Sequence, residues 1–142
     1  MRALLDINVL LALLDANHVD HTTARAWLSS EIEHGWASCA LTENGCVRVM
    51  SQPRYPGFVS SLAAAALLRR ATSTPHHAFW SCDLSLLDEG VFDDSRIHGP
   101  RQVTDAYLLA LAAANNGRFV TFDQGVPLGA VHRATGENLI IL

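Results

Sequence analysis

Short apolar runs alternate along the chain with longer stretches in which apolar side chains recur at helical spacing. The short runs are bounded by polar or turn-forming residues, as is typical of buried strands, and they lie at Arg2–Leu5, Trp36–Ser38, Ala78–Cys82, Arg118–Phe122 and Leu139–Leu142. The longer stretches predict helices at Asn8–Asp15, from Asp20 or Thr22 to His34, at Leu41–Ser51, at Phe58–Thr72 and at Val103–Asn116. Strands separated by helices pair in parallel through right-handed crossovers. We therefore expect an α/β fold, a three-layer α/β/α domain around a mostly parallel sheet of four to five strands.

The composition narrows the class of protein. The chain has 142 residues, of which 49% are hydrophobic and 17% charged, so it can bury a core that offsets the entropy lost on folding. No apolar run reaches the ~18 residues of a membrane span, and Asp6 and Asn8 interrupt the region where a secretory signal would lie. The three cysteines form no Cys-x-x-Cys pair, which argues against a disulfide framework or a cysteine zinc site. We expect one soluble, cytoplasmic domain over residues 1–142.

The charged residues exclude two kinds of chemistry. All ten basic residues are arginine. The absence of lysine excludes a P-loop, whose lysine contacts phosphates, and Schiff-base catalysis, which needs an amine. The formal net charge of −4 at first argues against a nucleic-acid partner. Whether it does depends on how many of the acids belong to a site rather than to the surface.

Four acids follow predicted strands or open predicted helices. Asp6 and Asp123 come directly after the first and fourth strands, whereas Glu43 and Asp105 lie in the first turns of helices. Strand ends and helix starts share one edge of a parallel sheet, so the four carboxylates can converge there. Packed carboxylates repel one another unless a cation compensates, and oxygen ligands of this kind suit Mg²⁺ or Mn²⁺. Such a cation can polarise a phosphodiester and activate water, which predicts phosphoryl chemistry. The alternative is that each acid only caps a helix or a turn.

The residues around these acids resemble the PIN-domain nucleases, and most closely the VapC toxins of bacterial toxin–antitoxin pairs. The resemblance rests on four segments in order along the chain, at Leu4–Leu10, Leu41–Gly45 followed by Arg48, Val103–Ala112 and Val120–Asp123. It implies a PIN-like fold and a Mg²⁺-dependent endoribonuclease, with Mn²⁺ as a substitute. The expected activity is cleavage of selected transfer or ribosomal RNA, which inhibits translation and growth. It further implies a VapB-type antitoxin as partner, and we expect a homodimer without membrane contact.

The resemblance also assigns roles to individual residues. It implies that metal binding and catalysis fall to Asp6, Glu43, Asp105 and Asp123. Asn8 and Thr121 match polar positions that orient the carboxylates or a water, and Thr104 is expected to cap the last helix and so place Asp105. With four acids assigned to a metal, ten remain against ten arginines, which leaves a balanced surface for RNA. Arg48 and Arg101 are then candidates for contacting RNA or antitoxin.

Other functions compete with this interpretation. The segment Leu5–Val9 is similar to the opening of haloacid-dehalogenase phosphotransferases, but Asn8 stands where that family has a second aspartate. The missing lysine weakens both that interpretation and a phospho-receiver with an acidic pocket. Seven histidines would permit a metal-free ribonuclease, which EDTA would not inhibit. A catalytically silent PIN scaffold is the non-enzymatic alternative.

Overall fold

The computed structural model describes residues 1–142 and places the five strands in one parallel sheet. The sheet order is β3-β2-β1-β4-β5, and its strands are β1 (Ala3–Leu5), β2 (Trp36–Cys39), β3 (His77–Trp80), β4 (Arg118–Thr121) and β5 (Leu139–Ile141). All four strand pairings are parallel. The expected parallel α/β sheet is therefore confirmed, with β1 at its centre.

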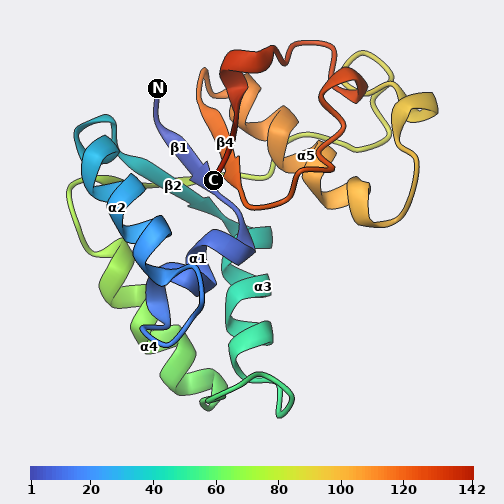
Figure 1. Cartoon of the computed structure of the whole chain (residues 1–142). Helices are drawn as coiled ribbons and strands as arrows, with labels where there is room; N and C mark the ends of the chain where they lie inside the picture. The colour runs from blue at the N-terminus through green and yellow to red at the C-terminus, as the bar shows by residue number, and fades with distance from the viewer.

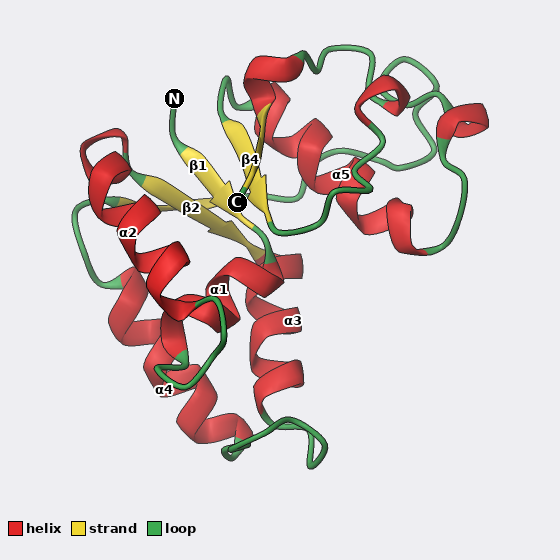
Figure 2. Cartoon of the chain, in the orientation of Figure 1, coloured by secondary structure: helices red, strands yellow, loops and turns green.

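Five α-helices cover the sheet, and they are α1 (Ile7–Leu14), α2 (His21–Glu31), α3 (Ala40–Met50), α4 (Ser61–Thr72) and α5 (Arg101–Ala114). Figure 1 shows α1 to α4 gathered on one side of the sheet and α5 on the other. Figure 2 shows that long loops accompany α5, where the chain between β3 and α5 contains only a short 3-10 turn at Asp94–Arg96. The sheet is therefore the middle layer, between a layer of α1 to α4 and a layer that contains α5, as expected for an α/β/α domain.

Alternate residues of each strand face opposite layers. In β1, Ala3 and Leu5 belong to the core beneath α1, α3 and α4, whereas Leu4 belongs to the core beneath α5. In β4, Val120 faces the first core and Phe119 the second. This alternation is the period of two that a strand imposes on its side chains, and burial on both faces explains why the central strand β1 is wholly apolar.

Several boundaries differ from the sequence prediction for local reasons. The second helix passes into a 3-10 turn at Ile32–His34, and Gly35 then adopts a φ of +74°, which glycine tolerates best. α4 begins at Ser61 rather than Phe58 because the Ser60 hydroxyl accepts a hydrogen bond from the Ala63 N–H at 3.1 Å and so caps the helix. None of the helices is long and apolar enough to cross a membrane.

The fold brings the predicted site to one edge of the sheet. β1 and β4 are neighbours, so the residues that follow them, Asp6 and Asp123, come from adjacent strand ends. α3 packs closely on α1 because Gly45 has no side chain, and a Cβ there would collide with Ile7. This close packing fixes the start of α3, which carries Glu43, beside the end of β1.

Candidate active site

Asp6 is a buried carboxylate with two hydrogen-bond donors. It follows β1 and caps α1, where its Oδ1 accepts from the Ile7 N–H at 2.7 Å. Its Oδ2 accepts from the Thr121 hydroxyl at 2.6 Å. Burial raises the pKa of Asp6, with a further contribution from the charge of Asp123, while the two hydrogen bonds oppose this rise. The residue therefore serves as a cap and also carries a charge that the chain does not neutralise.

Thr121 connects the ends of β1 and β4. Besides donating to Asp6, its oxygen accepts from the Asn8 side-chain amide at 3.1 Å and from the Asp123 N–H at 3.0 Å. The side-chain Oδ1 of Asn8 in turn accepts from the Phe122 N–H at 3.3 Å. The structure thus shows Asn8 and Thr121 in hydrogen bonds that orient the carboxylate of Asp6 and the backbone before Asp123.

Asp105 lies on α5 and is 8% exposed. Burial, and after it the negative charges of Asp6 and Asp123, together raise its pKa to about 7. Its carboxylate makes no hydrogen bond or ion pair within the chain, so no other residue offsets the cost of burying its charge.

Asp123 completes a group of three aspartates at this edge. It is exposed, and its Oδ1 accepts from the Gly125 N–H at 2.7 Å in a tight turn. Gln102, in the first turn of α5, donates to the Gly125 carbonyl at 2.8 Å and so ties this turn to the helix that carries Asp105. We refer to Asp6, Asp105 and Asp123 as the aspartate cluster.

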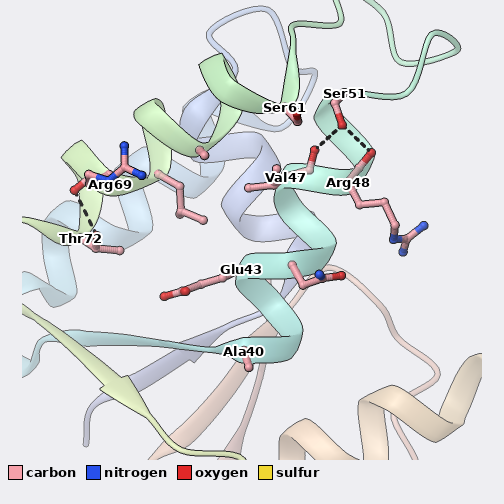
Figure 3. A pocket seen from close by; sticks show the side chains of 11 residues that line it. Ala40, Glu43, Val47, Arg48, Ser51, Ser61, Arg69 and Thr72 are labelled. Atoms are coloured by element: carbon pink, nitrogen blue, oxygen red, sulfur yellow. Dashed lines mark hydrogen bonds between the residues drawn. The ribbon is translucent and has the colours of Figure 1, made fainter.

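Glu43 lies apart from the aspartate cluster. Its Oε1 accepts a hydrogen bond from the Ser38 hydroxyl at 2.6 Å, and its side chain lines a cavity of about 800 Å³ between α3 and α4. Figure 3 shows Glu43 leaving α3 on the side opposite Arg48. No three acidic, histidine or cysteine side chains lie close enough to hold a metal ion. The charges of Asp6 and Asp123 thus act on Asp105 although the three carboxylates are not yet close enough to share an ion, and Glu43 is hydrogen-bonded elsewhere.

The expected cap at Thr104 is wrong. α5 begins at Arg101 with Pro100 at its N-cap position, so Thr104 lies within the helix and is exposed. Arg101 and Arg48 are both exposed and form no ion pair, which leaves their guanidinium groups free for a partner. The mistaken boundary arose because Pro100, rather than a hydroxyl residue, precedes the helix.

The donor set of the aspartate cluster suits a hard divalent cation. Carboxylate oxygens are the ligands that Mg²⁺ and Mn²⁺ prefer, and no arginine forms an ion pair with these three side chains. The raised pKa values of Asp6 and Asp105 show that the folded chain alone does not compensate their charges. A bound cation would compensate these charges, so the residue types fit the ion that the sequence predicts, and the three carboxylates would have to move closer together to hold it.

Sequence reasoning missed the residues that surround Glu43. Ser38 is a fully buried polar residue in β2, and its oxygen also lies 2.8 Å from Nε2 of His77 in β3. A polar residue inside a predicted strand, five positions before a candidate acid, was the available signal for Ser38. Nothing in the sequence pattern distinguished His77 from the neighbouring His76.

Comparisons with known proteins agree with this geometry. Residues 3–128 match the PIN domain family. The chain is 64% identical over 142 residues, the whole of both chains, to Ribonuclease VapC44 of Mycobacterium tuberculosis. It is 43% identical over 125 residues, 87% of this chain and 89% of the relative, to Ribonuclease VapC39 of the same species.

Solved structures share the fold at low identity. Mycobacterium tuberculosis VapC20, described as a sarcin-ricin loop cleaving toxin, has a TM-score of 0.58 at 16% identity, covering 87% of this chain and 91% of that one. VapBC2 from Rickettsia felis, solved bound to a DNA fragment from their promoter, gives 0.59 at 13% identity, covering 87% and 89%. The haloacid-dehalogenase and receiver interpretations gain no support from these comparisons. The chain belongs to the PIN-domain family and, within it, to the VapC ribonucleases.

Proposed function

We propose that the chain is a divalent-metal-dependent endoribonuclease that acts as the toxin of a toxin–antitoxin pair. The observation that carries this proposal is the aspartate cluster, where the buried carboxylates of Asp6 and Asp105 and the exposed carboxylate of Asp123 repel one another without a cationic partner. A structural cap would not need three acids in one place. The full-length similarity to a named ribonuclease supports cleavage of RNA rather than another phosphoryl reaction.

The cation would be Mg²⁺, or Mn²⁺ as a substitute, with Asp6, Glu43, Asp105 and Asp123 as its proposed ligands. When bound, it supplies a water of lowered pKa and stabilises negative charge on the phosphodiester. Thr121 and the Ile7 N–H each hold one oxygen of Asp6, so its remaining lone pairs have a fixed direction. The turn bonded to Gln102 holds the backbone of Asp123 against α5.

The RNA would be bound by exposed arginines. Arg48 on α3 and Arg101 at the start of α5 have unpaired guanidinium groups, which bind phosphates through paired hydrogen bonds. The substrate class we propose is a structured RNA of the translation machinery, either transfer or ribosomal RNA, whose cleavage would stop growth.

The proposed partner is a VapB-type antitoxin that occludes the site. A cavity of about 450 Å³ opens among α1, α2 and the end of α4, and most of its lining is apolar, including Leu10, Leu13, Leu14, Leu28 and Ile32. An apolar cavity between helices suits the nonpolar face of a partner helix. We also propose that the toxin is a homodimer, which sedimentation equilibrium of the free chain will test.

The proposed activity is tested by mapping new RNA 5′-phosphate ends across a transcriptome after brief induction of the protein. We expect sharp ends at a few sites with the wild type and none with Asp6→Asn. Asp83→Asn is the matched control, since Asp83 is exposed and makes no hydrogen bond. Equal cleavage by the wild type and Asp6→Asn would overturn the proposal. Ends that persist with purified protein in EDTA would instead indicate a histidine-based ribonuclease.

A further inference from the structure

The hydroxyl of Ser38 lies between two titratable side chains from different elements. Its oxygen is 2.6 Å from Oε1 of Glu43, at the start of α3, and 2.8 Å from Nε2 of His77, in β3. Ser38 itself is in β2 and is fully buried, so water does not compete for these hydrogen bonds. Residues far apart in the sequence thus form one hydrogen-bonded chain that ends at a proposed metal ligand.

The number of available hydrogens determines which group donates in each of these two hydrogen bonds. A serine hydroxyl has a single hydrogen, and here it is donated to the Glu43 carboxylate. Nε2 of His77 must then carry a hydrogen and donate it to the Ser38 oxygen. The ring of His77 packs against Trp36 with centroids 4.5 Å apart and a tilt of 58°, which restrains its orientation.

These hydrogen bonds hold Glu43 at the cavity between α3 and α4, where it is part of no group of side chains close enough to hold a metal ion. The charge of Glu43 acts on His77, whereas the charges acting on Asp105 are those of Asp6 and Asp123. A fourth carboxylate would add to the repulsion within the aspartate cluster while no cation is bound. The adjacent cavity between α3 and α4 leaves room for the side chain to rotate.

We propose that Ser38 and His77 are positioning residues that hold the Glu43 carboxylate outside the aspartate cluster, and that cation binding draws Glu43 away from Ser38. This inference rests on the proposed function, because it takes the aspartate cluster to be the cation site. It means that the hydrogen bonds of Glu43 oppose cation binding. In the metal-free protein, the negative charge of Glu43 therefore stays away from the aspartate cluster.

The test is a calorimetric titration of the full chain with Mn²⁺ alone. Removing a hydrogen bond to a charged group should free Glu43, so we expect Ser38→Ala to bind Mn²⁺ about tenfold more tightly than the wild type. In a Glu43→Gln background the same substitution should have no effect. Ser51→Ala is the matched control, since its hydroxyl donates only to backbone carbonyls of α3.

An unchanged or weaker affinity in Ser38→Ala would overturn the inference, because a hydroxyl that supports a bound ligand would lower affinity when removed. A second measurement covers the case in which this variant does not fold. Imidazole nitrogen NMR of the wild type should show the Nε2–H form of His77 without metal, and its resonances should move on addition of Mg²⁺ while those of His76 stay fixed. An Nδ1–H form, or no movement, would contradict the inference. Neither result bears on cleavage itself, which Asp6→Asn tests separately.

Discussion

The two acidic regions at the carboxyl edge of the sheet differ in how their charges are satisfied. Asp105 is buried among other carboxylates and has no hydrogen-bond donor, and its pKa is raised to about 7. Glu43, in the first turn of α3, instead accepts a hydrogen bond from the Ser38 hydroxyl, whose oxygen also lies 2.8 Å from Nε2 of His77. Acids that serve only to cap or pack would all be expected to find donors, as Glu43 does. Asp105, the aspartate of the cluster that has no donor, therefore sets the cluster apart from Glu43, and this difference supports the proposal that the cluster is the functional part of this edge.

The largest expected effect comes from removing a charge of the aspartate cluster. We expect Asp105→Asn to lower the rate of RNA cleavage by more than ~100-fold, beyond the loss that follows removal of an outer partner of a metal ligand. The rate is measured with purified protein at saturating Mg²⁺, with Asp83→Asn as control. Retention of more than a tenth of the wild-type rate would place Asp105 outside the catalytic centre.

A smaller effect is expected where the support of the aspartate cluster is removed. Thr121→Val keeps the shape of the side chain but leaves Asp6 and Asn8 without their shared partner. We expect Mn²⁺ affinity to fall ~10–100-fold and the free energy of unfolding to fall by ~1–3 kcal/mol. Calorimetry and urea unfolding measure these quantities, and Thr23→Val, at an exposed threonine of α2, is the control. Unchanged affinity would show that Thr121 only stabilises the fold.

The contrast between the two regions predicts opposite effects on metal-free stability. Asp105→Asn removes a charge that burial and two neighbouring carboxylates disfavour, so we expect the melting temperature in EDTA to stay equal or rise. Glu43→Gln weakens a charge-assisted hydrogen bond from a buried hydroxyl, so its free energy of unfolding should fall by ~1 kcal/mol. Destabilisation by Asp105→Asn of the same size would mean that the two regions do not differ.

The raised pKa of Asp105 also predicts a pH dependence. Its value in the folded chain is about 7, against 3.8 for the ordinary side chain, so between these values the folded state binds more protons than the unfolded state. The contribution of Asp105 to the free energy of unfolding of the metal-free protein therefore falls as pH rises through this window and is constant above it. Urea unfolding at about pH 5 and about pH 8 should show a difference for the wild type that Asp105→Asn reduces. If the free energy of unfolding changed by the same amount between the two pH values in both proteins, the raised pKa of Asp105 would be contradicted.

The smallest effect is expected at Thr104, which is exposed within α5. Thr104→Ala should change the free energy of unfolding by no more than ~0.5 kcal/mol and leave cleavage unchanged, as for an ordinary surface substitution. Removing a helix cap costs ~1 kcal/mol. A decrease of that size in the free energy of unfolding would show that Thr104 caps α5, as the sequence suggested.

Most of the fold could be predicted from the sequence because its signals are local. The apolar runs of β1 and β4 and the periodicity of α5 are set by burial, and the positions of Asp6 and Asp123 follow from the ends of parallel strands. Asn8 and Thr121 lie two residues from these acids, and the structure joins them by hydrogen bonds to each other and, through Thr121, to Asp6. Helix starts were less accurate where the capping residue was unusual, as at Pro100.

The orientation of Glu43 could not be predicted from the sequence. Its backbone position follows from the order of strand and helix, but its side-chain direction depends on a hydroxyl in β2 and an imidazole in β3. These partners come together only through the pairing of two strands, in which Ser38 lies beside Phe79 and Trp36 beside His77. Side-chain contacts made across a sheet leave no regular spacing along the chain.

The central claim is that the aspartate cluster binds the cation on which RNA cleavage depends. The most direct measurement follows cleavage of total RNA by the purified protein in EDTA and then after an excess of Mg²⁺ is added. We predict no cleavage in EDTA, and discrete products with 5′-phosphate ends after Mg²⁺ is added to the wild type but not to Asp6→Asn. Cleavage that continues in EDTA, or that Mg²⁺ restores equally to Asp6→Asn, would contradict the claim.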